Sequence, residues 1–197
     1  MAEQEVEEQG EVREREQLDP EREARRRLAL AQIRQYPDPV LRMRANEIES
    51  FDDDLRRLVE RMTTLMQEAR GVGLAGTQVG TLQRLFVFQP TEEDEPRAVV
   101  NPVLVSASEV TLSETEGCLS LQGVTIPVER PVKVTIEGKD ETGADIRLEL
   151  EEHAARVAQH ELDHLDGILI LDRTTPEARR EALGILRPEP DLGPISS

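Results

Sequence analysis

The strongest pattern along the chain is a run of apolar residues spaced three and four apart between positions 53 and 69. Such spacing predicts an amphipathic helix with one buried face. The apolar residues of that face are Leu55, Leu58, Val59, Met62, Leu65 and Met66. Further along, residues 132–136 and 146–150 alternate apolar and polar side chains on either side of a turn, which predicts a β-hairpin.

Shorter elements are predicted around these two. Apolar runs bounded by turn residues predict strands over 84–89, 98–105 and 168–171, and a helix over 152–166 directly after the hairpin. A last short helix is expected to begin near Thr174 and to end before Pro188, because proline cannot continue a helix.

The two ends of the chain differ in composition from the rest. Residues 1–30 are mostly Glu, Gln and Arg, and so few apolar residues cannot offset the entropy lost on ordering. We therefore expect an acidic extension over 1–30 that is disordered or marginally helical. Residues 31–187 are long enough for one domain with its own core, and 188–197 are expected to form a loose tail.

Composition narrows the class of protein. The formal net charge of −17 opposes binding to DNA or to anionic lipid, so we expect neither as a partner. One cysteine excludes an intramolecular disulfide framework and is typical of a reducing compartment. We found no apolar run that suits a signal peptide or a membrane span, and a cytoplasmic location is expected.

The predicted helix over 152–166 carries the clearest chemical motif. His160 and His164 are four residues apart, share one helical face and can reach one metal ion. Glu161 can take a proton from water, and Cys118 can complete three ligands with a position left for water, which indicates metal-assisted hydrolysis. A chance histidine pair on a solvated helix is disfavoured, because the flanks are apolar at Ala154, Ala155, Val157, Ala158 and Leu162.

The glycine-rich segment 71–78 matches the GxGxxG pattern of dinucleotide sites, but its surroundings do not. A phosphate-binding loop follows a strand and opens a helix, whereas here a helix precedes the glycines and a strand follows them. The alternative is that the glycines let the backbone approach a ligand closely, so that a peptide can pair with it as an added strand.

The third histidine, His153, lies on the same helical face as the motif but is not expected to bind the metal. It precedes His160 by seven residues, which is roughly 10 Å of helix, far beyond a metal–nitrogen bond of about 2 Å. We interpret Val157, between them, as a wall of the pocket. His153 would lie at the rim of the pocket or be a structural histidine.

Three segments in this order, 71–78, 116–120 and 159–164, resemble the signature motifs of bacterial peptide deformylases. The segment 36–41 resembles the family's usual opening, and the spacings correspond from about residue 33 to 173. The resemblance implies an α+β fold, with mixed and antiparallel strands packed around a central metal-binding helix. It implies removal of formate from N-formylmethionine on nascent chains.

The resemblance also assigns roles to residues. The metal ligands would be Cys118, His160 and His164, and the metal ferrous iron, for which zinc, nickel or cobalt can substitute. Glu161 would act as general base and then acid, while Gln78 and the N–H of Leu119 would hydrogen-bond the oxyanion. The peptide is expected to contact Gly71, Val72, Gly73, Glu116, Gly117, His153 and Val157.

Several positions depart from the common pattern of the family. Gly76, Gln122, His153 and Ala158 differ from the usual residues, so strict preference for methionine is in doubt. The last helix is short and carries Glu177 and Glu181 among its arginines, so any association with the ribosome is expected to be weak.

Two other functions remain open at this point. A zinc peptidase of the HExxH type would use a third ligand downstream of the helix, where this chain offers only acids such as Asp166 and Asp172. A deformylase-like domain that binds metal and peptide without turnover would be indicated by loss of Glu161 or Gln78, and both are present.

Overall fold

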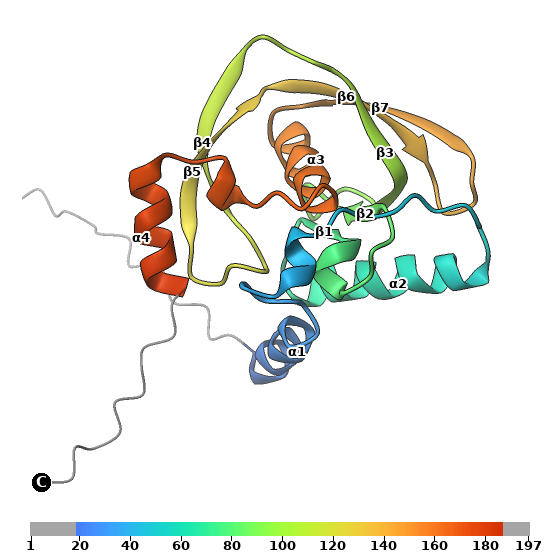
Figure 1. Ribbon diagram of the computed structural model, residues 1–197. Coiled ribbons are helices and arrows are strands. Elements are labelled where there is room, and N and C mark those ends of the chain that lie inside the picture. Colours follow the sequence, from blue (N-terminus) through green and yellow to red (C-terminus); the bar gives the residue numbers. More distant parts are fainter. Residues whose placement is uncertain (1–18, 187–197) are drawn as a thin grey trace, which may run out of the picture.

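Helix α3 (Glu152–Leu165) lies at the centre of the fold, between a five-stranded sheet and a two-stranded hairpin (Figure 1). The structure, a computed structural model, describes residues 19–186. The strands are β1 (Gly73–Ala75), β2 (Leu85–Phe88), β3 (Arg97–Ala107), β4 (Thr111–Gly117), β5 (Thr125–Pro131), β6 (Lys133–Lys139) and β7 (Asp145–Glu151). The other helices are α1 (Pro20–Leu30), α2 (Asp53–Glu68) and α4 (Pro176–Leu186), with short 3₁₀ helices η1 (Pro39–Arg42), η2 (Gly76–Val79) and η3 (Ile170–Asp172). Antiparallel sheets with separate helices confirm the predicted α+β fold.

Helix α2 forms where the apolar spacing predicted it. The Asp52 side chain accepts hydrogen bonds of 3.1 Å from the N–H groups of Asp54 and Leu55, which satisfies the first turn of the helix. Its buried residues, Leu55, Met62, Leu65 and Met66, pack with β1, β2 and α1 into one core cluster. After Ala69 the chain turns through Arg70, whose φ of 59° ends the helix, and enters β1.

The five-stranded sheet has the order β1-β2-β3-β6-β7, and every pair in it is antiparallel. The predicted hairpin is confirmed as β6 and β7, with Ile136 opposite Leu148 and Val134 opposite Leu150. Its apolar side chains pack against α3, so the alternation in the sequence corresponds to one face of the sheet that is buried and one that is exposed.

The hairpin of β4 and β5 was not predicted from the sequence. In β4, only Glu116 is buried, so this strand shows no apolar alternation. In β5, Ile126, Val128 and Arg130 point inward at alternate positions, but the arginine conceals the end of the pattern. The pairing of these two strands therefore depends on contacts made after the chain has folded, not on a local signal.

Helix α1 begins within the range 1–30 that we expected to be disordered or marginally helical. Asp19 caps it through a 3.1 Å hydrogen bond from the N–H of Glu21, and Pro20 occupies its first turn. Only Ala29 and Leu30 are buried, against α2, so the apolar face is one turn long and is too short for a periodic signal. Residues 1–18, and the tail expected over 188–197, lie outside the described residues.

The expected strand over 168–171 is wrong. Leu169, Ile170 and Leu171 are buried as predicted, but the chain forms η3 here. The Asp172 side chain accepts a 2.9 Å hydrogen bond from the N–H of Leu169, which closes a tight turn and leaves no neighbouring strand to pair with. An apolar run alone therefore does not separate a strand from a buried turn.

Helix α3 contacts five strands, β1, β2, β5, β6 and β7. Nearly all of its residues from Ala155 to Leu165 are buried, including five that are polar or charged: Arg156, Gln159, Glu161, Asp163 and His164. Burial of so much polar surface requires partners, and those partners form the site described below. No helix within residues 19–186 is long and apolar enough to cross a membrane.

The packing of α2 gives a first prediction. Met62 is fully buried in the cluster that joins α1, α2 and the sheet, whereas Met43 is 46% exposed. We expect Met62→Ala to lower the free energy of unfolding by about 2–5 kcal/mol, because the lost methylenes leave a cavity. Met43→Ala should change it by less than about 0.5 kcal/mol. Urea unfolding of both variants measures this, and equal small losses would show that α2 is not part of the core.

Candidate metal centre

Cys118, His160 and His164 bring three ligand atoms together beside α3. Nε2 of His160 and Nε2 of His164 are 3.2 Å apart, and Sγ of Cys118 is 3.2 Å from Nε2 of His164. All three atoms lie within 4.8 Å of one another. Three ligands at about 2.0–2.3 Å from a tetrahedral ion would be separated by distances close to these. The predicted ligand set can therefore hold one divalent metal.

Cys118 is positioned by the turn that follows β4. The N–H of Leu121 donates to the Cys118 carbonyl at 3.0 Å, and the N–H of Ser120 donates to Sγ at 3.4 Å. Nε2 of Gln78 is 3.7 Å from the same sulfur. Gln78 itself is held by two further hydrogen bonds, from the N–H of Ala75 at 2.8 Å and to Oγ of Ser120 at 3.1 Å. The thiol and the amide are thus fixed with respect to each other.

The carboxylate of Glu161 lies against the backbone of β1. A Cβ atom added to Gly73 would be 2.3 Å from Oε1 of Glu161, so only glycine leaves room for this carboxylate. Oε2 is buried and has no hydrogen-bond partner among the described residues, as expected of a group that awaits a ligand or water. Burial raises the pKa of Glu161 to about 7, whereas a bound divalent cation would act in the opposite direction.

His160 is oriented by a buried carboxylate. Nδ1 of His160 is 3.0 Å from Oε2 of Glu116, a contact that favours donation by Nδ1–H and leaves Nε2 as the ligand atom. Burial opposes protonation of His160, yet hydrogen bonds with Cys118 and Glu116 raise its pKa well above 6.5. Burial and the charge of His160 instead lower the pKa of His164 well below 6.5, which favours the neutral imidazole that a metal ion requires.

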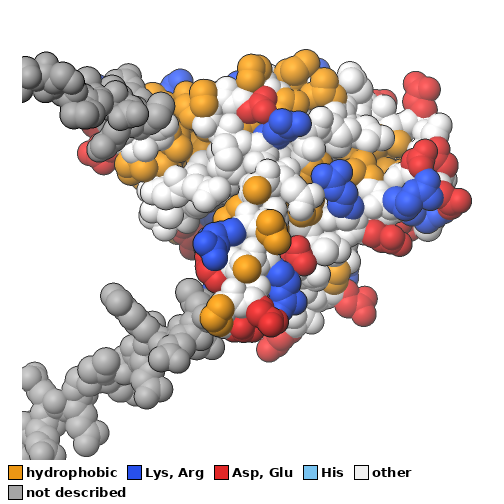
Figure 2. All heavy atoms as spheres, turned by 90° about the horizontal axis from the view of Figure 1, so that it is seen from below, with side chains coloured by type: hydrophobic (Ala, Val, Ile, Leu, Met, Phe, Trp, Pro, Cys, Tyr) orange, Lys and Arg blue, Asp and Glu red, His pale blue; other side chains and the backbone are white. Residues whose placement is uncertain are grey.

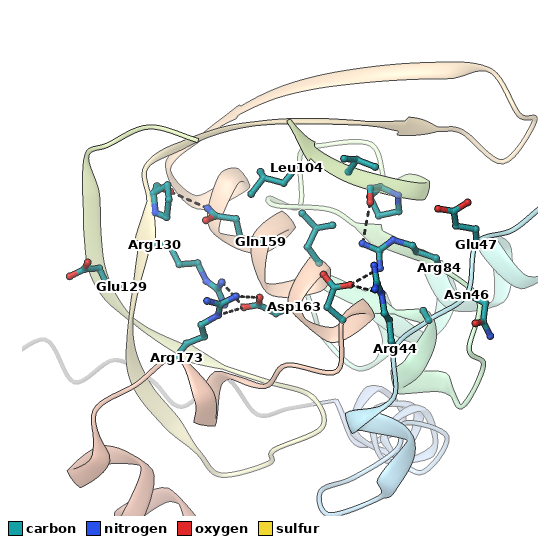
Figure 3. Close-up of a pocket in the computed structure, with 16 residues that line it drawn as sticks. Arg44, Asn46, Glu47, Arg84, Leu104, Glu129, Arg130, Gln159, Asp163 and Arg173 are labelled. Carbon is teal, nitrogen blue, oxygen red and sulfur yellow. Dashed lines mark hydrogen bonds and ion pairs between the residues drawn. The ribbon is translucent and has the colours of Figure 1, made fainter. Parts of the chain in front are cut away.

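Glu116 is in turn held by two arginines. Arg130 donates to both oxygens of Glu116, at 2.6 and 2.9 Å, and Arg156 donates to Oε1 at 2.8 Å. Arg130 also donates to Asp163 at 2.9 Å, and Arg173 donates to the same carboxylate, as Figure 3 shows. Burial would raise the pKa of Glu116, but hydrogen bonds from His160 and Arg130 outweigh it and hold that pKa far below its usual range.

This charged network was missed from the sequence. Arg130 occupies the third of three alternating inward positions in β5, and Arg156 lies among the buried alanines of α3. An arginine at an otherwise apolar position of such a pattern is the signal that could have revealed it, because a buried charge requires a partner. The identity of the partner, Glu116, could not be read from local spacing.

A central cavity of about 450 Å³ opens onto the metal centre. The predicted contact residues Gly71, Val72, Gly73, Glu116, Gly117, His153 and Val157 all line it, together with Gln78, Cys118, Leu119, His160 and Glu161. Other residues that line it were not expected, among them Arg26 and Leu30 of α1, Arg70, and Arg156 of α3. The structure therefore gathers the predicted site residues at one cavity, with the fully buried His164 behind it.

The four departures from the family pattern separate into two groups. Gln122 and His153 line the central cavity and can affect what binds there. Ala158 is fully buried in the core between α3 and the sheet, and a Cβ atom added to Gly76 would lie 2.5 Å from the carbonyl oxygen of Gln83. Neither Ala158 nor Gly76 lines the cavity, so the doubt about pocket shape applies only to Gln122 and His153.

A second hollow, of about 770 Å³, lies on the opposite side of α3. Figure 3 shows Arg130 and Arg173 pointing at Asp163, with Arg44 and Arg84 nearby. Arg84 donates to Asp166 at 2.8 Å, so the charges in this hollow are largely paired with each other. We interpret it as the outer side of the network that supports α3.

The family model, the relatives and the solved structures that match this chain are all peptide deformylases. A family model described as polypeptide deformylase matches residues 30–180. The peptide deformylase of Thermodesulfovibrio yellowstonii is 41% identical over 155 residues, which cover 77% of this chain and 93% of that protein. A crystal structure of peptide deformylase from Thermotoga maritima has a TM-score of 0.71 and 42% identity over 73% of this chain and 97% of its own. Arabidopsis thaliana peptide deformylase 1B, solved with an inhibitor, has a TM-score of 0.75 and 38% identity over 79% of this chain and 89% of its own.

The support of His160 by Glu116 can be tested. Glu116→Gln keeps the shape of the side chain but removes the charge that holds Nδ1–H and leaves two buried arginines less well paired. Loss of such a partner typically weakens metal binding by about 10- to 100-fold. Competition with a chelator measures the affinity. The matched control is Glu129→Gln, an exposed residue of the same hairpin, and an equal change in both variants would contradict the role of Glu116.

Proposed function

This chain belongs to the polypeptide deformylase family, metal-dependent hydrolases that remove the formyl group from nascent peptides, and we propose that the site around Cys118, His160 and Glu161 performs this reaction. The observation that carries the proposal is the Glu161 carboxylate, which is buried and unpaired among the described residues beside three ligand atoms in an open cavity. The products would be formate and a peptide with a free methionine amine.

Cys118, His160 and His164 would hold one divalent ion through a thiolate and two neutral imidazoles. Such an ion supplies Lewis acidity and lowers the pKa of a bound water to near neutrality. We propose ferrous iron as the metal in the cell, on the basis of the family resemblance. The same donors also accept zinc, nickel or cobalt, since Cys and His ligands suit all of these ions.

Glu161 would move the proton. Its carboxylate would take a proton from the attacking water and later deliver it to the amine that leaves. Burial favours the protonated form and a bound cation favours the ionised form, so the carboxylate can serve in both steps. Gln78 and the N–H of Leu119 would stabilise the oxyanion. That N–H makes no hydrogen bond with the described residues, and Leu119 lines the central cavity with Gln78.

The peptide would bind along β1. This strand pairs only with β2 among the described strands, and its first residue, Gly73, lines the central cavity together with the preceding Gly71 and Val72. A formylated peptide could add there as a further strand, with its formyl group at Glu161. Glu116, Gly117, His153 and Val157 would line the walls around the first side chain.

We propose a cytoplasmic location and at most weak association with the ribosome. A lone cysteine is typical of a reducing compartment. Helix α4 is short and carries Glu177 and Glu181 among its arginines. Figure 2 shows basic and acidic side chains interspersed on the face seen from below, which is a poor match for a strongly anionic surface.

The geometry disfavours an HExxH peptidase. Its third ligand would come from downstream of α3, but Asp166 is paired with Arg84 at 2.8 Å and Asp172 is paired with Arg42. The upstream Cys118 lies 3.2 Å from a histidine ligand atom instead. A binding domain without turnover is disfavoured because Glu161 and Gln78 both line the cavity.

The proposed function can be tested with iron-loaded protein prepared without oxygen. We expect formate from a formyl-Met peptide and no cleavage of its unformylated counterpart. Fragments of the unformylated peptide would indicate a peptidase. Binding of the formylated peptide without any product would indicate a domain that does not turn over.

The role of Glu161 gives a sharper prediction. Glu161→Gln should lower kcat by about 10²- to 10⁴-fold, because the amide cannot take a proton. Metal content should stay the same, since Glu161 is not among the three ligands. Glu152→Gln, on the exposed first turn of α3, is the matched control and should leave kcat unchanged. Near-normal turnover by Glu161→Gln would show that Glu161 does not transfer the proton.

His153 is predicted to influence which first residue is accepted. It lines the cavity from an exposed position near Val157, so its polar ring borders the space for the first side chain. When methionine binds, the His153 ring would lose hydrogen-bond partners, and leucine would remove this cost. We expect His153→Leu to raise the selectivity for formyl-Met over polar first residues by about tenfold or less, because the exposed ring can still contact water. Values of kcat/KM for a panel of formylated peptides measure this. Identical rankings for parent and variant would make His153 a structural residue.

A further inference from the structure

We infer that Arg26 and Arg70 form a carboxylate-binding rim of the central cavity, which selects formylated peptides with acidic side chains at their third or fourth residue. The inference rests on the proposed function and names a class of substrate for it. Both arginines line the same cavity as Cys118 and His160.

The rim joins two parts of the chain. Arg26 lies on α1, which precedes the matched family segment 30–180, and Arg70 lies in the turn from α2 to β1. Burial of Ala29 and Leu30 against α2 fixes α1 at this side of the cavity. The rim therefore combines a residue of the family segment with one that the N-terminal part of this chain adds.

These two guanidinium groups are available for a ligand, whereas the third arginine of the cavity is not. Arg156 is bonded to Glu114, to Glu116 and to two carbonyl groups. Arg26 makes one long ion pair, with Glu23 at 3.7 Å within α1, and its side chain stays 39% exposed. Its buried Nε has no hydrogen-bond partner among the described residues. Arg70 is exposed and forms no ion pair within residues 19–186.

The direction of the peptide brings its later residues to the rim. The formyl group must lie at Glu161, whose carboxylate abuts Gly73. Beyond Gly73, toward Ala75, Gly76 and Thr77, the chain is fully buried, so a bound peptide can leave only past Gly71. Arg70 is three residues from Gly73, about 10 Å at roughly 3.3 Å per residue of strand. The third or fourth residue of the peptide would therefore come level with Arg70.

The net negative charge of the protein limits binding of acidic peptides to those that place a carboxylate at this rim. A chain with a net charge of −17 repels acidic peptides in general, and two local arginines would offset that repulsion for a carboxylate at one position. Guanidinium groups bind carboxylates in a bidentate manner, which lysine cannot do. The adjoining hollow is lined by Arg22, Arg25 and Arg70 and also by Asp19, Glu68 and Glu92, so its charge is mixed and no wider basic surface extends outward.

The test compares formyl-Met peptides that differ only in having Glu, Gln or Lys at the third and fourth residues. With metal-loaded protein at low salt, we expect kcat/KM to favour Glu over Lys by about three- to tenfold, mainly through KM, since partly exposed ion pairs contribute modestly. High salt should reduce the preference. The variant R26Q/R70Q should lose the preference for the Glu peptide, and this loss should appear in KM and not in kcat. R27Q, an exposed arginine of α1 that does not line the cavity, should keep the preference.

Several outcomes would overturn the inference. These are equal kcat/KM for the Glu and Lys peptides in the parent protein, or a loss in R27Q as large as in the double variant. If the double variant unfolds, the single variant R70Q, which leaves α1 unchanged, is used instead. R70Q must then reduce the preference for the Glu peptide over the Lys peptide. If no formyl-Met peptide is hydrolysed, the proposed function fails. The rim is then judged by calorimetric Kd values for the same peptides, and equal values would overturn it.

Discussion

The carboxylate of Glu116 is the point on which the site depends. It lies in β4, is almost fully buried, and accepts hydrogen bonds from Arg130 of β5, from Arg156 of α3 and from His160, a candidate metal ligand. One anion thereby connects the hairpin of β4 and β5, the central helix and the candidate metal centre. Without it, Arg130 would keep only Asp163 as an anionic partner and Arg156 only the half-exposed Glu114, and breaking a buried ion pair costs about 3–5 kcal/mol.

This network explains why a helix so rich in polar residues can occupy the centre of the fold. Asp163, which lies between His160 and His164 in the sequence, is bonded to Arg130 and Arg173 on the side of α3 away from the cavity. On the cavity side, Glu161 keeps one oxygen unpaired among the described residues. The charge of Asp163 on one side of α3 is therefore neutralised, while the Glu161 carboxylate on the other side is free to accept a proton. Rigid support behind a reactive group is what preorganised catalysis requires.

The sequence predicted the parts of this arrangement that depend on local spacing. The stripe on α2, the alternation in β6 and β7 and the histidine pair on α3 are repeated patterns within a few turns or strands, and the structure contains all three elements. Contacts between distant residues were not predicted. Glu116 and Arg156 are 40 positions apart, and neither shows its partner in its own segment. The short apolar face of α1 and the polar strand β4 were missed for the same reason, since only tertiary contact stabilises them.

The residues at the floor of the central cavity make many buried contacts, whereas Arg26 and Arg70 at its rim make few. At the floor, Gly73 cannot accept a Cβ atom because Glu161 occupies that space, and Cys118 is held by hydrogen bonds from its own turn and from Gln78. Any change there disturbs several buried partners at once. At the rim, Arg70 is exposed, and Arg26 belongs to a helix anchored by one buried turn. Substitutions at the rim cost little stability, because exposed side chains have few partners to lose. The buried network therefore fixes the candidate metal centre, whereas residues at the entrance of the cavity can change without loss of the fold.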